Sequence, residues 1–225
     1  MSLLPSAKEL LTLAIRKAPD ADVNTLHGET YNLILHYRKE YYEGEVDAFL
    51  GTLDIGKEEK AKMKKGLLEP TPNGYSNIME KISRRVSQSI QPLSGNIAQL
   101  CVERELIKAG LEEDVHFIKG QKKRTDIIIY HKRKTHRVEI KNVSMRERAV
   151  RGLGFDGDSL FGFFNAPAEF TDETIKIIDG LCKKSGGYCY IPPATLKRIT
   201  IKSKFIRPNT QFGKDIKRFV RGGKL

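Results

Sequence analysis

The chain has 225 residues, of which 39% are hydrophobic and 30% charged, so it can bury a sizeable core and wholesale disorder is not expected. Its net charge of +12 is unevenly placed: residues 1–90 carry 13 basic and 13 acidic side chains, whereas residues 91–225 carry 27 basic against 15 acidic. No run approaches the roughly 20 apolar residues that span a bilayer, and three cysteines without a CxxC pair predict neither a disulfide framework nor a zinc site.

The basic excess indicates a polyanionic partner that is bound mainly by residues 91–225. Nucleic acid is favoured over a membrane surface, although both attract the same charge. Lys8 and Glu9 interrupt the short apolar run near the N-terminus, which therefore predicts an amphipathic helix and not a signal peptide. We expect a cytoplasmic protein.

The first part of the chain is predicted to be helical. Apolar spacing and turn-forming residues predict helices and one loop: helices over 5–17, 29–41, 57–68 and 77–90, and the loop EPTPNGYSN over 69–77. Pro92, Ser94 and Gly95 predict a break before the next helix, which Ser94 or Asn96 could cap and which ends at Gly110.

Short strands dominate the remainder. The predicted strands cover 115–119, 126–130, 137–143, the stretch GGYCYIPP and 197–206, with helices over 171–183 and 210–220. Thr171 is the expected cap of the first of these helices. Residues 151–170 (RGLGFDGDSLFGFFNAPAEF) predict a glycine-rich, aromatic loop. This order predicts an α/β fold, or α+β, with a central mixed sheet flanked by helices and a helical N-terminal region.

The stretch TDIIIYHKRKTHRVEIKN (125–142) predicts a β-hairpin. If its loop has an even length, paired residue numbers sum to 265, and Asp126 faces Glu139 with β-carbons about 4.5–5.5 Å apart. Lys141 lies two residues on and shares that face, and the other face is apolar: Ile127, Ile129, Val138 and Ile140. A three-residue loop would move Asp126 to the other face, and the loop lacks the glycine that two-residue turns prefer.

Two carboxylates that lie so close repel each other unless a cation separates them. A hard divalent cation with oxygen ligands suits Asp126 and Glu139, and Mg²⁺ fits best. A bound metal can lower the pKa of a water molecule and stabilise charge on a phosphate, while Lys141 can position the attacking water. Such a site serves phosphodiester hydrolysis. The alternative is an ordinary hairpin with charged edges.

Asp126 followed by Glu139-Ile140-Lys141 resembles the motif of the PD-(D/E)XK nuclease superfamily, and specifically of type II restriction endonucleases. The resemblance covers about residues 95–143, and Thr125 stands where the family usually has proline. It implies a restriction-endonuclease-like core and a Mg²⁺-dependent endonuclease acting on double-stranded DNA. For the restriction subset it also implies a homodimer that reads a short palindrome. A cognate DNA methyltransferase in the same system, which would not be a stable partner, is an option that the sequence leaves open.

In this family a helix before the first strand often contributes a glutamate to the metal site. The corresponding helix here is GNIAQLCVERELIKAG, in which Gln99 occupies the usual position and Glu103 lies one turn later on the same face. Either residue could complete the catalytic site. A glutamine would lower the negative charge around the metal.

Basic and neutral polar residues on both sides of the hairpin are candidates for DNA contact. Lys and Arg side chains can bind phosphates or guanine edges, and neutral donors can add to them: the candidates are Lys122, Lys123, Arg124, Asn142, Ser144, Arg146, Arg148 and Arg151. The alternative for each is a solvated surface position.

The favoured function is therefore a type II restriction endonuclease with a nuclease core over 91–225 and a helical region over 1–90 that dimerises or closes around DNA. A Holliday-junction resolvase or repair nuclease on the same core is the second hypothesis. A non-catalytic nucleic-acid-binding protein, whose binding is salt-sensitive and accompanied by no cleavage, is the third.

Overall fold

The computed structural model describes residues 4–68, 77–120, 125–142 and 157–225. The chain forms two compact units, one of Met1–Pro19 and Gly28–Ile97 and the other of Asp20–His27 and Ala98–Leu225. Among the described residues, no helix has both the length and the apolar character needed to cross a membrane.

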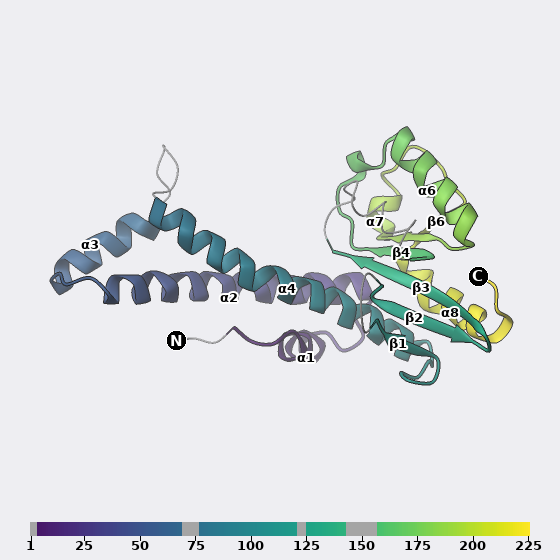
Figure 1. Cartoon of the computed structure of the whole chain (residues 1–225), viewed down its shortest axis with the longest axis horizontal. Coiled ribbons are helices and arrows are strands. Elements are labelled where there is room, and N and C mark those ends of the chain that lie inside the picture. The colour runs from purple at the N-terminus through teal and green to yellow at the C-terminus, as the bar shows by residue number, and fades with distance from the viewer. Residues whose placement is uncertain (1–3, 69–76, 121–124, 143–156) are drawn as a thin grey trace. The chain divides into compact units, whose positions relative to one another are not determined.

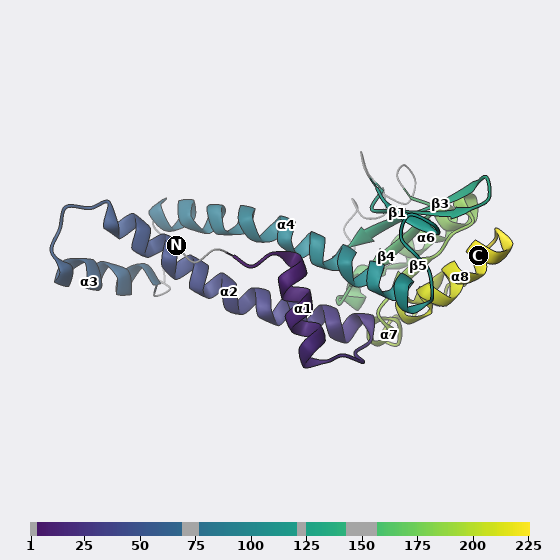
Figure 2. The same cartoon turned by 90° about the horizontal axis from the view of Figure 1, so that it is seen from below.

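The first unit is built from helices, which Figures 1 and 2 show as α1 to α4. They are α1 (Ala7–Lys17), most of α2 (Val23–Gly51), α3 (Lys57–Leu68) and the first part of α4 (Asn77–Lys108). A capping box starts α1, because the Ser6 hydroxyl accepts from the Glu9 N–H and the Glu9 carboxylate accepts from the Ser6 N–H. Apolar side chains of α2 and α4 form the buried cluster of this unit: Val46, Leu50, Ile82 and Val86.

Two helix predictions were wrong in extent. The helix predicted over 29–41 is α2, which begins six residues earlier because the Asp22 carboxylate accepts from the N–H groups of Asn24 and Thr25 at 2.8 and 3.2 Å. The break predicted at Pro92 does not occur, since α4 continues through it. Proline removes one hydrogen bond at a cost of about 3 kcal/mol, and burial of apolar side chains on both sides of it, such as Val86 and Ile97, offsets that loss.

The end of α4 was predicted correctly. Gly110 has a φ of 80°, which glycine adopts without steric penalty. Its N–H donates to the Ile107 carbonyl at 2.8 Å, and the Leu111 N–H donates to the Leu106 carbonyl at 3.1 Å. These two bonds are those of a Schellman motif, which closes the helix and turns the chain towards the sheet.

The second unit contains a six-stranded sheet in the order β1-β2-β3-β4-β5-β6. The strands are β1 (Phe117–Lys119), β2 (Ile127–His131), β3 (Lys134–Lys141), β4 (Ser159–Gly162), β5 (Cys189–Ile191) and β6 (Ile206–Pro208). The first three pair antiparallel and the others parallel, so the sheet is mixed as predicted. Further helical elements are η1 (Pro167–Glu169), α6 (Asp172–Ser185, capped by Thr171), α7 (Pro193–Leu196), η2 (Asn209–Gln211) and α8 (Phe212–Gly222).

Helices α6 and α8 cover opposite faces of this sheet (Figure 1). On β4, Leu160 packs with Ile175 and Ile178 of α6. The next residue, Phe161, meets Phe212 of α8 edge to face with ring centroids 5.0 Å apart. Because neighbouring residues of a strand point to opposite faces, these contacts define an α6 face and an α8 face.

Two predictions in the second half were wrong. Residues 159–162, predicted as loop, form β4, a central strand in which every residue is buried. The stretch 197–206, predicted as a strand from its alternation, consists mostly of turns and enters β6 only at Ile206. Its apolar residues Ile199 and Ile201 pack against the cluster beneath α6, so the alternation reflects a loop lying on the core.

Candidate active site

The β2–β3 hairpin has the even register that the sequence predicted. The paired residues run from Ile127–Val138 to His131–Lys134, and the residue numbers of each pair sum to 265. Lys132 and Arg133 form the two-residue loop, and Lys132 takes a φ of 52°. A positive φ at this position is what two-residue hairpin loops require, so the turn forms without the glycine expected there.

Asp126 stands directly before β2, where the main-chain pairing with β3 ends. Its N–H donates to the Val138 carbonyl at 3.2 Å, and its Oδ2 accepts from the Ile140 N–H at 2.6 Å. The Asp126 side chain thus accepts a hydrogen bond from β3 at the point where backbone-to-backbone pairing with β2 ends. Burial raises the pKa of Asp126, while the Ile140 N–H and the nearby Lys141 ammonium act in the opposite direction.

Glu139 and Lys141 occupy alternate positions of β3 and contact each other. The Lys141 ammonium donates to Glu139 Oε1, and the Glu139 residue is only 7% exposed. Gly157 passes so close that a β-carbon there would lie 3.2 Å from the Glu139 β-carbon. The buried glutamate therefore lies close to Gly157, which precedes β4, and pairs with a lysine that offsets its burial.

These contacts bring Asp126, Glu139 and Lys141 together at the carboxyl end of β3. Lys141 interacts with both carboxylates, because its ammonium bonds to Glu139 and its charge acts to lower the pKa of Asp126. In the described ranges, no group of three or more His, Cys, Asp or Glu side chains is arranged to hold a metal ion. Mg²⁺ is commonly held by one or two carboxylates together with water and substrate phosphates, so the two partly or fully buried carboxylates fit such an ion.

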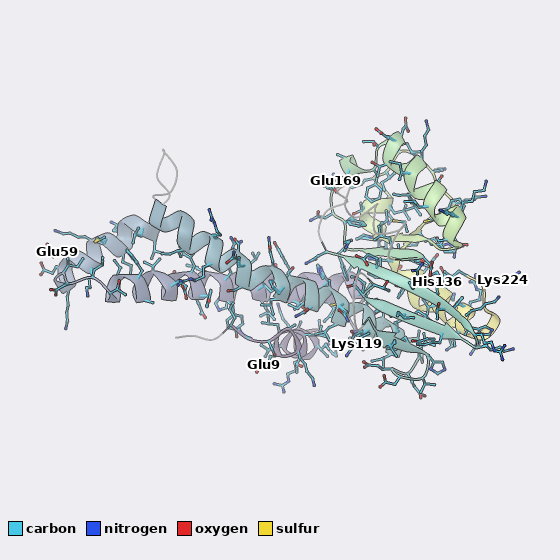
Figure 3. All side chains as sticks on the ribbon, in the orientation of Figure 1. Glu9, Glu59, Lys119, His136, Glu169 and Lys224 are labelled. Atoms are coloured by element: carbon cyan, nitrogen blue, oxygen red, sulfur yellow. The ribbon has the colours of Figure 1, made fainter. Side chains whose placement is uncertain are left out.

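Gln99 and Glu103 lie together on α4 and are bound to each other and to β1. Gln99 Nε2 donates to Glu103 Oε1 at 2.9 Å, and the ammonium of Lys119, labelled in Figure 3, lies 3.3 Å from Glu103 Oε2. Burial raises the pKa of Glu103, whereas Gln99 and Lys119 lower it. That Gln99 or Glu103 completes the catalytic site stays a prediction.

Most of the predicted DNA contacts, namely Lys122, Lys123, Arg124, Ser144, Arg146, Arg148 and Arg151, lie outside the described residues. Asn142 is described and half-buried. Its side chain interacts with the ring of His27, a residue of α2 that is far away in the sequence, and this interaction raises the pKa of His27 in part. The sequence carried no signal for His27, because the contact depends on tertiary structure and not on spacing.

A cavity of about 620 Å³ lies at the other end of β3. His136 and Lys224, both labelled in Figure 3, line it together with Lys134, Lys183 and Tyr188. It includes neither Glu139 nor Lys141 and is therefore separate from the candidate site.

The mixed sheet with its flanking helices is a restriction-endonuclease-like fold, which confirms the fold implied by the PD-(D/E)XK motif. Solved structures of Ecl18kI, a type II restriction endonuclease of that superfamily, share it. Two of them, metal-depleted Ecl18kI with uncleaved DNA and with uncleaved, modified DNA, give TM-scores of 0.69 and 0.67. Sequence identity is 13% and 12%, and the alignments cover 97% of this chain and 80% and 79% of Ecl18kI.

No protein-family model and no curated protein matches the chain. The fold therefore rests on the three-dimensional comparison. At such low identity the comparison speaks for the fold alone, and an activity has to be argued from the candidate site.

Proposed function

We propose that this protein is a Mg²⁺-dependent endonuclease that hydrolyses phosphodiester bonds of double-stranded DNA at a short sequence, as type II restriction endonucleases do. The observation that carries the proposal is the grouping of Asp126, Glu139 and Lys141 by the hairpin register, on a restriction-endonuclease-like sheet. The excess of basic residues in 91–225 supports a nucleic acid as the partner. The DNA bound in the Ecl18kI complexes supports DNA in particular.

In this proposal Asp126 and Glu139 hold the Mg²⁺. The Ile140 N–H fixes one oxygen of Asp126, and burial with Gly157 close to its β-carbon limits the conformations of Glu139. A bound Mg²⁺ supplies Lewis acidity towards a phosphate oxygen and a lowered pKa for a bound water. The protein contributes two prearranged carboxylates, so little reorganisation is needed when DNA arrives.

In the proposed reaction Lys141 acts on the attacking water and on the scissile phosphate. Its ammonium bonds to Glu139 and stays close to Asp126, so it remains at the site without substrate. From there it can orient the water and offset charge that develops on the phosphate oxygens. The contact with Glu139 also removes part of the lysine's side-chain freedom before the reaction.

The test is cleavage of a long duplex DNA by the purified protein with Mg²⁺ and with EDTA, beside the variant Asp126→Asn. Discrete fragments that require Mg²⁺ and disappear in the variant are expected. Asp172→Asn is the matched control, because Asp172 lies in the first turn of α6 and outside the candidate site. The control should cleave at the wild-type rate.

Other outcomes separate the competing functions. Cleavage of four-way junctions but not of linear duplexes would identify a resolvase. Salt-sensitive binding with no cleavage under any condition would identify a binding protein and contradict the proposal.

We also propose that the active form is a homodimer, since a symmetric pair of sites suits a palindromic sequence. Light scattering at the concentration used for cleavage tests this, and a monomer there would contradict it. A cognate DNA methyltransferase that protects the same sequence completes the proposed restriction system. Resistance of methylated duplexes to cleavage is the expected sign of it.

A further inference from the structure

His27 belongs to the same compact unit as the candidate site, although most of α2 does not. The start of this helix is attached to the sheet unit by a pair of amides. Asn24 Nδ2 donates to Asn209 Oδ1 at 2.8 Å, and Asn209 Nδ2 returns a bond to Asn24 Oδ1 at 2.7 Å. Asn209 is 1% exposed, so this reciprocal pair fixes the first turn of α2 in a buried setting.

From this fixed turn the His27 ring reaches two residues next to Lys141. It stacks on Phe163 with ring centroids 3.9 Å apart and an interplanar angle of 11°. It also interacts with the side chain of Asn142, the residue that follows Lys141, and this interaction acts on the His27 pKa. Phe163 is connected to Lys141 as well, because its N–H donates to the Lys141 carbonyl at 3.1 Å.

These contacts lie on the face of the sheet opposite to the candidate site. Phe163 meets Phe161 at 5.3 Å, and Phe161 points to the α8 face. Glu139 is the register partner of Leu160, which packs on the α6 face. His27 therefore supports the end of β3 from behind, while the Lys141 side chain emerges on the other face with Glu139.

The ring is suited to such a support at neutral pH. Burial lowers the pKa of His27 to about 4, and the interaction with Asn142 raises it only in part. A neutral imidazole has one donor and one acceptor nitrogen, so it can stack on Phe163 and hold Asn142 without bringing a second positive charge towards Lys141.

We propose that His27 is a positioning residue, which fixes the end of β3 through Asn142 and Phe163 and thereby sets the place of the Lys141 ammonium. The inference rests on the proposed nuclease function, because it assigns His27 to the placement of a catalytic lysine. β3 ends at Lys141, and the last residue of a strand is where the backbone opens most readily. Small displacements of a catalytic group lower rates strongly, so the support matters at this residue.

The test compares His27→Phe with His36→Phe in the full-length protein. His27→Phe keeps an aromatic ring for the stack and removes the ring nitrogens. His36 lies on the same helix with its side chain 66% exposed, where it pairs with Glu40, and is the matched control. The measurements are single-turnover cleavage with Mg²⁺, DNA affinity in EDTA, and hydrogen exchange of the Phe163 amide.

For His27→Phe we expect cleavage to slow by about tenfold and DNA affinity to stay within about twofold of wild type. Exchange of the Phe163 amide should accelerate relative to the amide of Leu160 in the middle of β4. Asn142→Ala added to His27→Phe should slow cleavage little further, since both residues act through one contact. His36→Phe should change none of these quantities.

Equal cleavage and equal Phe163 exchange in the two variants would overturn the inference. Uniformly faster exchange at Phe163 and Leu160 would also overturn it, because it would show a general loss of stability. If the wild-type protein cleaves no DNA, the proposed function fails, and the exchange measurement by itself decides whether His27 fixes the strand end.

Discussion

The two ends of β3 both carry polar side chains, but they use them differently. At the first end, His136 bonds to the Ser159 hydroxyl at 2.9 Å, and the Arg137 guanidinium pairs with the Asp158 carboxylate at 3.1 Å. These groups meet complementary partners, and the Ser159 hydroxyl also accepts from the Tyr188 N–H at 2.9 Å. At the second end, the contacts among described residues bring two carboxylates, Asp126 and Glu139, to the ammonium of Lys141.

The comparison teaches how structural and functional polar groups can be distinguished on one strand. The matched pairs at the first end stabilise the sheet, and their charges and hydrogen bonds are already satisfied within the protein. An excess of carboxylate at the second end stores unfavourable free energy that a cation would relieve. Burial shifts pKa values at both ends, since it lowers the pKa of His136 to about 4 and raises the pKa of Asp126.

The largest effect is expected from removing the lysine of the second end. Lys141→Ala should slow single-turnover cleavage by about 10³-fold, comparable to the loss of one group that stabilises transition-state charge. Lys134→Ala, at the first end of the same strand, is the matched control and should cleave normally. Similar losses in both variants would mean that the lysines act through general charge, and the distinction between the ends would fail.

A smaller effect concerns the pH dependence of stability at the first end. His136 is 4% exposed and has a lowered pKa, so the unfolded chain binds its proton more readily and stability falls as pH drops from about 6.5 to about 4. His136→Gln should reduce this decrease in the free energy of unfolding by up to about 3 kcal/mol. Unfolding by denaturant across this range measures it, with the exposed His36→Gln as the control.

His27 contributes to the same fall, so part of the pH dependence should persist in His136→Gln. The absolute stability of this variant is not the readout, since the bond to Ser159 is also altered. An unchanged slope between the two pH values would show that His136 is protonated in the folded protein.

The smallest expected effect is the pH dependence of stability that is due to Asp126 at the second end, and it has the opposite sign to that of His136. Because the pKa of Asp126 is raised in the folded protein, its contribution to stability is fully present at low pH and is lost as pH rises through that value. Asp126→Asn should therefore stabilise the protein slightly at neutral pH, while abolishing cleavage. Mg²⁺ should raise the melting temperature of the wild type and not that of the variant.

Thermal unfolding at neutral pH and at pH 3 provides the control for this last prediction. At the lower pH the wild-type carboxyl is protonated, so the difference between the two proteins should shrink. A variant that is less stable than wild type at neutral pH would show that Asp126 serves the fold and not a ligand.

The hairpin could be predicted from the sequence because its determinants are local. Alternation of Ile127, Ile129, Val138 and Ile140 set the buried face, and loop parity set the register. The roles of Asp126, Glu139 and Lys141 remain a prediction, but their proximity followed from that register. In this hairpin pattern reasoning was sufficient, because one face is buried and the other carries polar side chains.

β5 is buried throughout and was still predicted as a strand within GGYCYIPP, whereas β4 was not predicted. β4 contains Ser159 and Gly162 and is buried throughout, so it shows no alternation and was taken for a loop. The 197–206 stretch alternates without being a strand, because its apolar residues pack on the core from turns. His27 could not be predicted either, since its partners at 142 and 163 are brought to it only by the folded sheet.

The three cysteines have a practical consequence for how this protein can be studied. All are free and buried, and burial raises the pKa of the Cys101 and Cys182 thiols to about 12 and holds that of Cys189 well above its usual range. Thiolates are the species that react with maleimides and iodoacetamides, so the native protein should label slowly. A fluorophore could therefore be attached to one engineered surface cysteine while all three natural residues stay in place.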